Sequence, residues 1–303
     1  MATTATDRGL LIGGEWAETG EWIEVRSPYD GALVGRVAKG GATETRRALD
    51  AAEQALGDPL PAHERAAILD RVAELLEARA ENAAHIISAE AGKPLKAARV
   101  EASRAVSTFT MAAVEARKLA GEMVPMDAAQ AGEGKLAFTL REPIGIVGAI
   151  SPFNFPLNLV AHKIAPALAA GCTVVLKPAE WSPLSCSLLC DLVSEAGFPP
   201  GVFNVVQGIG EEVGAALARH PGVRRISFTG SPETAVHIGT AAARNIVPFT
   251  GELGGKGPLL VFGDADLEAA ARKAAGPVST LSQPGGRPAS CSSSASSSAE
   301  SGV

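Results

Sequence analysis

From residue 143 onward the chain alternates between short apolar runs and amphipathic runs, and this alternation limits the possible folds more than any other feature. The strand-like runs span residues 144–150, 173–177, 202–206, 224–229 and 258–262. The helical patterns between them span residues 156–170, 183–196, 211–219 and 232–243. Because repeated strand–helix units of this length form parallel strands joined by crossover helices, the pattern predicts an α/β fold with a doubly wound, mostly parallel sheet.

The region before residue 143 has a different organisation. Short strand-like pieces at residues 10–16, 22–26 and 33–38 precede a long amphipathic helix predicted over 63–91, and a second helix is predicted from Pro94 to about residue 120. Residues 121–142 then predict a protruding hairpin arm, in which two β pieces flank a flexible stretch at 128–134. Such an arm serves either to meet another subunit or as a plain surface hairpin, and the sequence leaves both interpretations open.

Charge and hydropathy exclude several classes of protein. The net charge is −6 and there is no long basic run, which argues against nucleic acid or an anionic membrane as a partner. No apolar run approaches the roughly 20 residues that span a bilayer, and the N-terminus lacks the pattern of a secretory signal. The 4 cysteines form no C-x-x-C pair and no His cluster is present, so we expect no metal site. The same cysteine pattern leads us to expect that the protein resides in a reducing cytoplasm.

Polar residues stand where strand-like runs pass into helices, and Asn154 is the first of them. It lies in the segment Pro152-Phe153-Asn154-Phe155-Pro156, directly after the run 144–150. The carboxyl ends of parallel strands meet at one edge of a sheet, which is where α/β proteins bind ligands. The Asn154 amide can donate a hydrogen bond to a developing oxyanion, or it can simply cap the following helix.

The other strand-end groups have structural explanations too. Lys177 and Glu180 are able to form a surface pair, Gly230-Ser231 a helix N-cap, and Gly254-Gly255 a tight turn. Taken singly, none of these groups identifies a function.

Gly208-Ile209-Gly210 suggests a dinucleotide-binding fingerprint, but the pattern is incomplete. Val213 occupies the position of the third glycine, and Gly214 comes one residue late. The segment therefore fails as a G-x-G-x-x-G motif.

Four sequence segments, taken together, indicate one protein family. They occur in the order and at the spacings of the aldehyde dehydrogenase superfamily, which the chain resembles over about residues 9–275. The matched part resembles the Rossmann-like, NAD(P)-binding portion of that family. The segments are Phe153-Asn154-Phe155-Pro156, Lys177-Pro178-Ala179-Glu180, Phe228-Thr229-Gly230-Ser231 and Glu252-Leu253-Gly254-Gly255-Lys256.

The resemblance implies an oxidoreductase that converts an aldehyde to a carboxylic acid with NAD or NADP as hydride acceptor. In this family a cysteine thiolate attacks the aldehyde. Asn154 matches the amide that stabilises the oxyanion, and Glu252 matches the general base. Lys163 matches a lysine that relays protons or sets the charge of the site. The family's enzymes are homo-oligomers, and a relative that reduces acyl phosphates is a less favoured match because Glu252 is kept.

The resemblance also implies a cofactor site. Lys177 and Glu180 match residues that hold the adenosine ribose hydroxyls, while Gly230 and Ser231 match the close approach to the pyrophosphate at a helix N-terminus. Gly254 is assigned to the same cofactor site. A carboxylate at Glu180 would repel a 2′-phosphate, so NAD is favoured and NADP stays possible.

The chain departs from the family near its C-terminus. Gly286 stands where the family carries its nucleophilic cysteine, and Cys291 lies further along in a serine-rich stretch. We expect an NAD(P)-binding domain over residues 1–275, a disordered tail over 276–303 and no catalytic domain, as in a truncated or frame-shifted product. The polypeptide is then expected not to oxidise aldehydes, and a catalytically inactive nucleotide-binding remnant or interaction module is the alternative.

Overall fold

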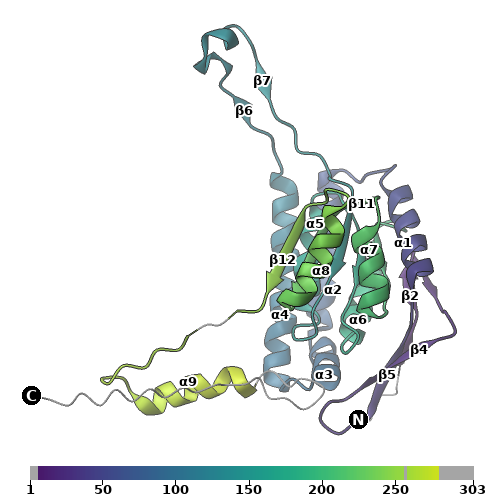
Figure 1. Cartoon of the computed structure of the whole chain (residues 1–303), viewed down its shortest axis with the longest axis vertical. Coiled ribbons are helices and arrows are strands. Elements are labelled where there is room, and N and C mark those ends of the chain that lie inside the picture. The colour runs from purple at the N-terminus through teal and green to yellow at the C-terminus, as the bar shows by residue number, and fades with distance from the viewer. Residues whose placement is uncertain (1–5, 256–257, 280–303) are drawn as a thin grey trace, which may run out of the picture.

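The computed structural model describes residues 6–255 and 258–279 of the chain, and its central feature is a seven-stranded sheet (Figure 1). The strand order is β12-β11-β8-β9-β10-β2-β3, in which the first five are parallel and β2 and β3 are antiparallel. The strands are β2 (Leu10–Ile12), β3 (Glu15–Ala17), β8 (Ile146–Ile150), β9 (Thr173–Lys177), β10 (Phe203–Val205), β11 (Val223–Gly230) and β12 (Phe249–Leu253).

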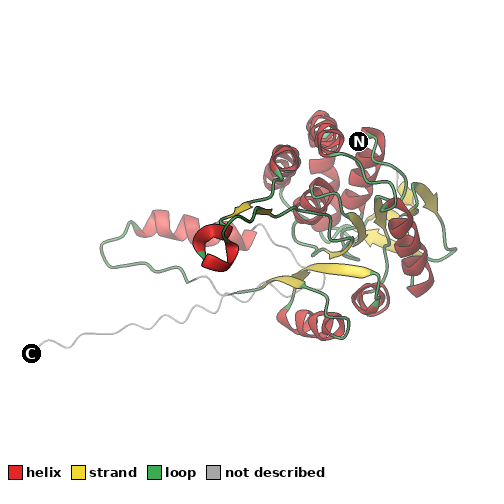
Figure 2. Ribbon diagram, turned by 90° about the horizontal axis from the view of Figure 1, so that it is seen from above, coloured by secondary structure: helices red, strands yellow, loops and turns green. Residues whose placement is uncertain are grey.

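Helices cover both faces of this sheet, as Figure 2 shows from above. This arrangement confirms the predicted doubly wound, mostly parallel sheet, and the antiparallel pair comes from the N-terminal strands. The helices are α1 (Ala42–Ala55), α2 (Ala62–Ala78), α3 (Ala80–Ala91), α4 (Leu95–Lys118), α5 (Asn158–Ala169), α6 (Leu184–Ala196), α7 (Ala215–Arg219), α8 (Pro232–Ala243) and α9 (Leu267–Ser279). A π-helical turn, η3 (Gly210–Gly214), precedes α7.

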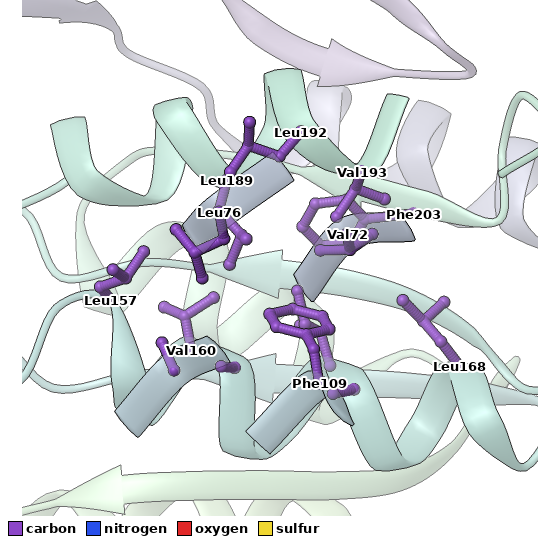
Figure 3. Close-up of a cluster of buried hydrophobic side chains, with 14 of the residues drawn as sticks. Val72, Leu76, Phe109, Leu157, Val160, Leu168, Leu189, Leu192, Val193 and Phe203 are labelled. Carbon is purple, nitrogen blue, oxygen red and sulfur yellow. The ribbon is translucent and has the colours of Figure 1, made fainter. Parts of the chain in front are cut away.

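Two hydrophobic cores follow from the alternation of side chains along the strands. Val147 and Ala149 of β8 face the core formed with α2 to α6, part of which Figure 3 shows around Phe109. Ile146 and Ile150 face the opposite core, formed with α1, α7 and α8. The central strands β8, β9 and β10 are thus buried on both faces, which explains why their sequences are nearly continuous apolar runs.

Two smaller sheets complete the described fold. The strands β1 (Thr6–Arg8), β5 (Leu33–Ala38) and β4 (Trp22–Arg26) form one of them, and β6 (Met123–Val124) pairs antiparallel with β7 (Ala137–Phe138) in the other. Short 3-10 turns, η1 (Met126–Ala128) and η2 (Gln130–Gly132), join β6 to β7. This hairpin protrudes from the body of the molecule in Figure 1, as the sequence predicts.

The prediction of a single helix over residues 63–91 was wrong. The helix breaks at Arg79, where φ is −111° and ψ is 14°, and the chain continues as α3. The bend lets α2 and α3 both pack against α4, a tertiary requirement that the apolar period of the sequence does not reveal.

The prediction of a strand over residues 258–262 was also wrong. The strand beside β11 is β12, which pairs with it in parallel from Ile226↔Phe249 to Gly230↔Leu253. Between the two strands, the Phe249 ring stacks on the Phe228 ring with 6.2 Å between centroids. Residues 258–262 are exposed and carry no strand.

Helix α9 continues past the expected domain boundary at residue 275 to Ser279. The rest of the predicted tail, with Gly286 and Cys291, lies outside the described residues, as does Lys256 of the fourth segment. In the described ranges no helix is both long enough and apolar enough to cross a bilayer.

Candidate active site

A cleft of about 810 Å³ opens at the carboxyl ends of the central parallel strands. Lys177 lines it as the last residue of β9, Glu180 lines it just beyond that strand, and Gly230 and Ser231 line it at the end of β11. The structure therefore brings together four residues that the sequence analysis assigned to a cofactor site. This position agrees with the general rule for ligands of open α/β sheets.

Lys177 is a buried cation, so the interpretation of Lys177 and Glu180 as a mere surface pair was wrong. Its side chain is 5% exposed, whereas that of Glu180 is 31% exposed. The Lys177 Nζ donates to Glu180 Oε1 at 2.9 Å and to the Pro178 carbonyl at 3.1 Å. The pair fixes an ammonium and a carboxylate side by side on the cleft wall.

Gly230 and Ser231 form the turn between β11 and α8. The Ser231 hydroxyl accepts a hydrogen bond from the Thr234 amide at 3.2 Å, which confirms the N-cap interpretation. A Cβ on Gly230 would lie 2.5 Å from the Phe228 ring, so only glycine fits there without displacing the ring. The N-terminus of α8 therefore faces the cleft, and helix N-termini attract anions.

Asn154 does not cap the helix that follows it, so that interpretation was wrong. Instead, Glu101 of α4 accepts hydrogen bonds from the amides of Leu157 and Asn158 at 3.0 and 3.1 Å. Within the described residues, the side-chain oxygen of Asn154 is buried and has no hydrogen-bond partner. Its backbone carbonyl accepts from the Lys93 ammonium at 2.8 Å.

Lys163 of α5 and Glu252 of β12 lie on either side of Thr229. The Lys163 Nζ donates to the Thr229 hydroxyl at 2.7 Å, and Thr229 is paired with Glu252 across the β11–β12 ladder. Burial lowers the pKa of Lys163 to about 8, and the charge of Glu252 opposes that shift. Glu252 itself is exposed.

The predicted catalytic residues Asn154, Lys163 and Glu252 do not line the cleft. Phe153, which precedes Asn154 in the chain, and Thr229, whose hydroxyl Lys163 contacts, do line it. Gly254 is exposed beyond the end of β12 and also lies outside the cleft wall. The structure thus brings Lys163 and Glu252 together, and places Asn154 one residue from the cleft.

Several residues of the cleft were missed by the sequence analysis. Ser151 lines it, and its buried hydroxyl has no partner among the described residues. Ile209 and Gly210 also line it, although the rejected glycine fingerprint had set them aside. Their position a few residues after the strand-like run 202–206 was the available signal. Lys93 and Glu101 carry no signal in the sequence because they lie far from Asn154 along the chain.

Cys172, Cys186 and Cys190 are buried and form no disulfide. None of these described cysteines lines the cleft. They pack in the core on the α2–α6 side of the sheet.

A second, more apolar groove of about 630 Å³ lies between α4 and α5. Its polar lining includes Arg104 and His162, and His162 directly precedes Lys163. Burial lowers the pKa of His162, and the charges of Arg104 and Lys163 lower it further.

Comparison with known proteins identifies the family. A profile of the aldehyde dehydrogenase family matches residues 16–282. The 3-sulfolactaldehyde dehydrogenase of Priestia megaterium is 39% identical over 269 residues, which cover 89% of this chain and 56% of the relative. The NADP(+) succinate-semialdehyde dehydrogenase of Escherichia coli is 43% identical, over 86% of this chain and 54% of the relative. The chain spans about half the length of the curated relatives it matches.

Solved structures agree with this result. An NADP-dependent enzyme from E. coli superposes with a TM-score of 0.84 at 42% identity, covering 88% of this chain and 56% of that one. An NAD+ complex of an aldehyde dehydrogenase from Bacillus cereus superposes with a TM-score of 0.83 at 35% identity, covering 88% and 55%. Sequence profile, fold and strand-end segments agree, and this chain belongs to the aldehyde dehydrogenase family.

Proposed function

We propose that the chain carries the cofactor-binding part of an oxidoreductase that converts an aldehyde to a carboxylic acid with NAD or NADP. The observation that carries this proposal is the 810 Å³ cleft, in which Lys177, Glu180, Gly230 and Ser231 meet at the carboxyl edge of the sheet. The domain assignment over residues 1–275, with the hairpin arm at 121–142, belongs to the same proposal.

The chemistry of the cleft fits a dinucleotide. The Lys177–Glu180 pair offers a donor and an acceptor for ribose hydroxyls, and the N-terminus of α8 at Ser231 offers backbone donors to a phosphate. The missing side chain at Gly230 leaves room for close approach, and Gly254 is included in the site because its backbone is exposed beyond β12. When bound, the nicotinamide supplies the acceptor of the hydride.

Three residues carry the proposed catalysis. Asn154 donates its amide to the oxyanion formed when a nucleophile attacks the aldehyde. Glu252 acts as the general base, and exposure leaves it able to reach a water. Lys163, with a pKa of about 8 beside Glu252, exchanges a proton near neutral pH and passes it along the Thr229 side of the site.

The substrate class is an aldehyde that carries an acidic group. Relatives are named for 3-sulfolactaldehyde and for succinate, glutarate and aspartate semialdehydes, all of which combine an aldehyde with an anion. In this chain, Arg104 and His162 add basic groups to the apolar groove beside α5. A cation in a mostly apolar groove favours an anionic ligand.

A second candidate is a nucleotide-binding chain without catalysis of its own. The burial of Cys172, Cys186 and Cys190 favours it, because none of these three thiols reaches the cleft. Under both candidates we place the protein in the reducing cytoplasm, since these cysteines are unpaired. The exposed apolar hairpin, with Met123 and Phe138, supports a homo-oligomer.

Calorimetric titration of the full chain with NAD and with NADP tests the cofactor site. We expect heat from both cofactors, with NAD bound more tightly. Glu180→Gln removes the carboxylate that repels a 2′-phosphate and should shift the preference towards NADP. Glu211→Gln is the matched control, because Glu211 lines the same cleft outside the Lys177 pair and should leave the preference unchanged. Absence of heat at millimolar NAD and NADP would refute the cofactor proposal.

Absorbance of the reduced cofactor separates the two candidates. The full chain is mixed with NAD and succinate semialdehyde, and the same assay is repeated with Cys291→Ser. Turnover that disappears in the variant assigns catalysis to this chain, whereas NAD binding without turnover supports the non-catalytic candidate.

A further inference from the structure

A buried ion pair lies behind the turn that carries Asn154. Lys93 precedes α4 and Glu101 lies on α4, and their side chains are 3% and 0% exposed. The Lys93 Nζ lies 2.5 Å from Glu101 Oε2. Taking two charges out of water is unfavourable unless further hydrogen bonds satisfy them, so the remaining contacts of the pair show what it does.

Within the described residues, the other hydrogen bonds and the ring contact of the pair are made with the turn between β8 and α5. Lys93 donates to the Asn154 carbonyl at 2.8 Å, and its Nζ lies 3.7 Å from the centroid of the Phe155 ring. Glu101 accepts from the amides of Leu157 and Asn158. The ion pair therefore holds the turn at both ends, immediately at Asn154 and at the first residues of α5.

We infer that Lys93 and Glu101 are positioning residues for Asn154, an inference that rests on the oxyanion role proposed above. The buried side-chain oxygen of Asn154 has no partner among the described residues, so the backbone of the turn sets where the amide points. An oxyanion donor contributes only when it is held close to its productive geometry. The Lys93–Glu101 pair holds the turn in place from the region of α4, and neither residue lines the cleft.

The side-chain amide resonances of Asn154 provide a test that needs no enzymatic activity. The full chain contains five asparagines, so selective 15N labelling of asparagine gives few signals, and loss of a pair of signals in Asn154→Asp assigns that residue. We expect Lys93→Met to shift or broaden the Asn154 amide signals while those of Asn204 and Asn245 stay in place. Lys93→Gln, which keeps N–H donors but not the charge, should give a smaller change of the Asn154 signals than Lys93→Met.

The matched control is Arg99→Met. Arg99 lies on α4, like Glu101, and forms an ion pair with Glu81 on the solvent-exposed face. We expect the control to leave the Asn154 signals unchanged. A folded Lys93→Met chain with a lower melting temperature and unshifted Asn154 signals would show that the pair only stabilises the fold, and the inference would be wrong.

Two further measurements test the inference if Lys93→Met does not fold. Glu101→Gln keeps the shape and an acceptor for the two amides but removes the ion pair, and it should give a smaller shift of the Asn154 signals. In the unsubstituted chain, hydrogen exchange should be slow at the amides of Leu157 and Asn158, and fast exchange there would overturn the inference. The Asn154 signals are recorded before NAD is added, so a later titration with NAD on the same samples tests the cofactor proposal separately.

Discussion

The turns after β8 and β9 and the edge strand β12 all contribute to the candidate site, but they are held in place very differently. After each of these two turns, a buried glutamate from α3 or α4 caps the helix that follows. Glu101 of α4 caps α5, and Glu90 of α3 accepts hydrogen bonds from the amides of Leu184 and Ser185 at the start of α6. In contrast, β12 is an edge strand, and Glu252 on it is exposed.

The difference separates two halves of the proposed chemistry. Asn154, Lys177 and Glu180 lie at or just beyond the ends of strands inside the sheet, where buried polar contacts from α3 and α4 hold the backbone that follows. Such contacts are strong and specific because the surrounding dielectric is low. Glu252 depends on pairing with one neighbouring strand, and strand edges tolerate movement and new partners. We therefore expect the half that contains Asn154, Lys177 and Glu180 to be the more rigid one.

Removing a buried cap should have the largest effect. Glu101→Ala leaves the Lys93 ammonium buried without its counter-ion, so we expect the free energy of unfolding to fall by about 3–5 kcal/mol. Glu252→Ala, on the exposed edge strand, should change it little. Urea denaturation followed by tryptophan fluorescence measures both, and equal effects of the two substitutions would remove the contrast between the two regions.

The second buried cap should make stability depend on pH. Burial raises the pKa of Glu90 from 4.5 to about 7. Between these values the folded chain keeps a proton that the unfolded chain releases, so this contribution is fully present below pH 4.5 and is lost as pH rises through about 7. We expect it to be on the order of 3 kcal/mol. Urea denaturation at several pH values should show a decline relative to Glu90→Gln, and parallel curves would contradict the assignment.

A medium effect is expected at the end of β11. Gly230→Ala places a methyl group 2.5 Å from the Phe228 ring, and we expect a loss of about 1–3 kcal/mol of stability together with weaker NAD binding. Gly263→Ala is the control, since no atom lies within 4 Å of its added Cβ and it lies outside the proposed cofactor site. Thermal denaturation and calorimetric titration compare the two variants, and an effect of equal size at Gly263 would show that the loss does not come from the contact with Phe228.

The smallest effect is expected at the junction of the two regions. Glu252 raises the pKa of Lys163 against the lowering by burial, so Glu252→Gln should bring that pKa below about 8 and leave stability nearly unchanged. The rate of Lys163 acetylation against pH, read by mass spectrometry, reports the shift. Glu180→Gln is the control, because Glu180 contacts Lys177 and not Lys163, and it should leave the pKa of Lys163 unchanged. An unchanged Lys163 profile in Glu252→Gln would mean that the two side chains do not interact.

The parallel sheet and the positions of its central strands could be read from the sequence because they depend on local apolar periodicity. The run predicted at residues 173–177 coincides with β9, and the pattern predicted at 232–243 coincides with α8. Strand-end residues could be read for the same reason: once strands are parallel, the residues after them share one edge. Lys177, Glu180, Gly230 and Ser231 meet at the cleft on this basis.

Only the tertiary structure decided the contacts that join distant segments. The helix breaks at Arg79 because both of its halves pack against α4. Residues 249–253, and not 258–262, form the edge strand because they pair with β11. A local sequence pattern does not reveal either of these packing partners. Likewise, an N-cap is expected from the residue just before a helix, whereas α5 is capped by Glu101 on another helix. The sequence determined which residues stand at the ends of the strands, but the folded chain determined what holds them, because a buried charge is satisfied by whichever donors the fold brings within reach.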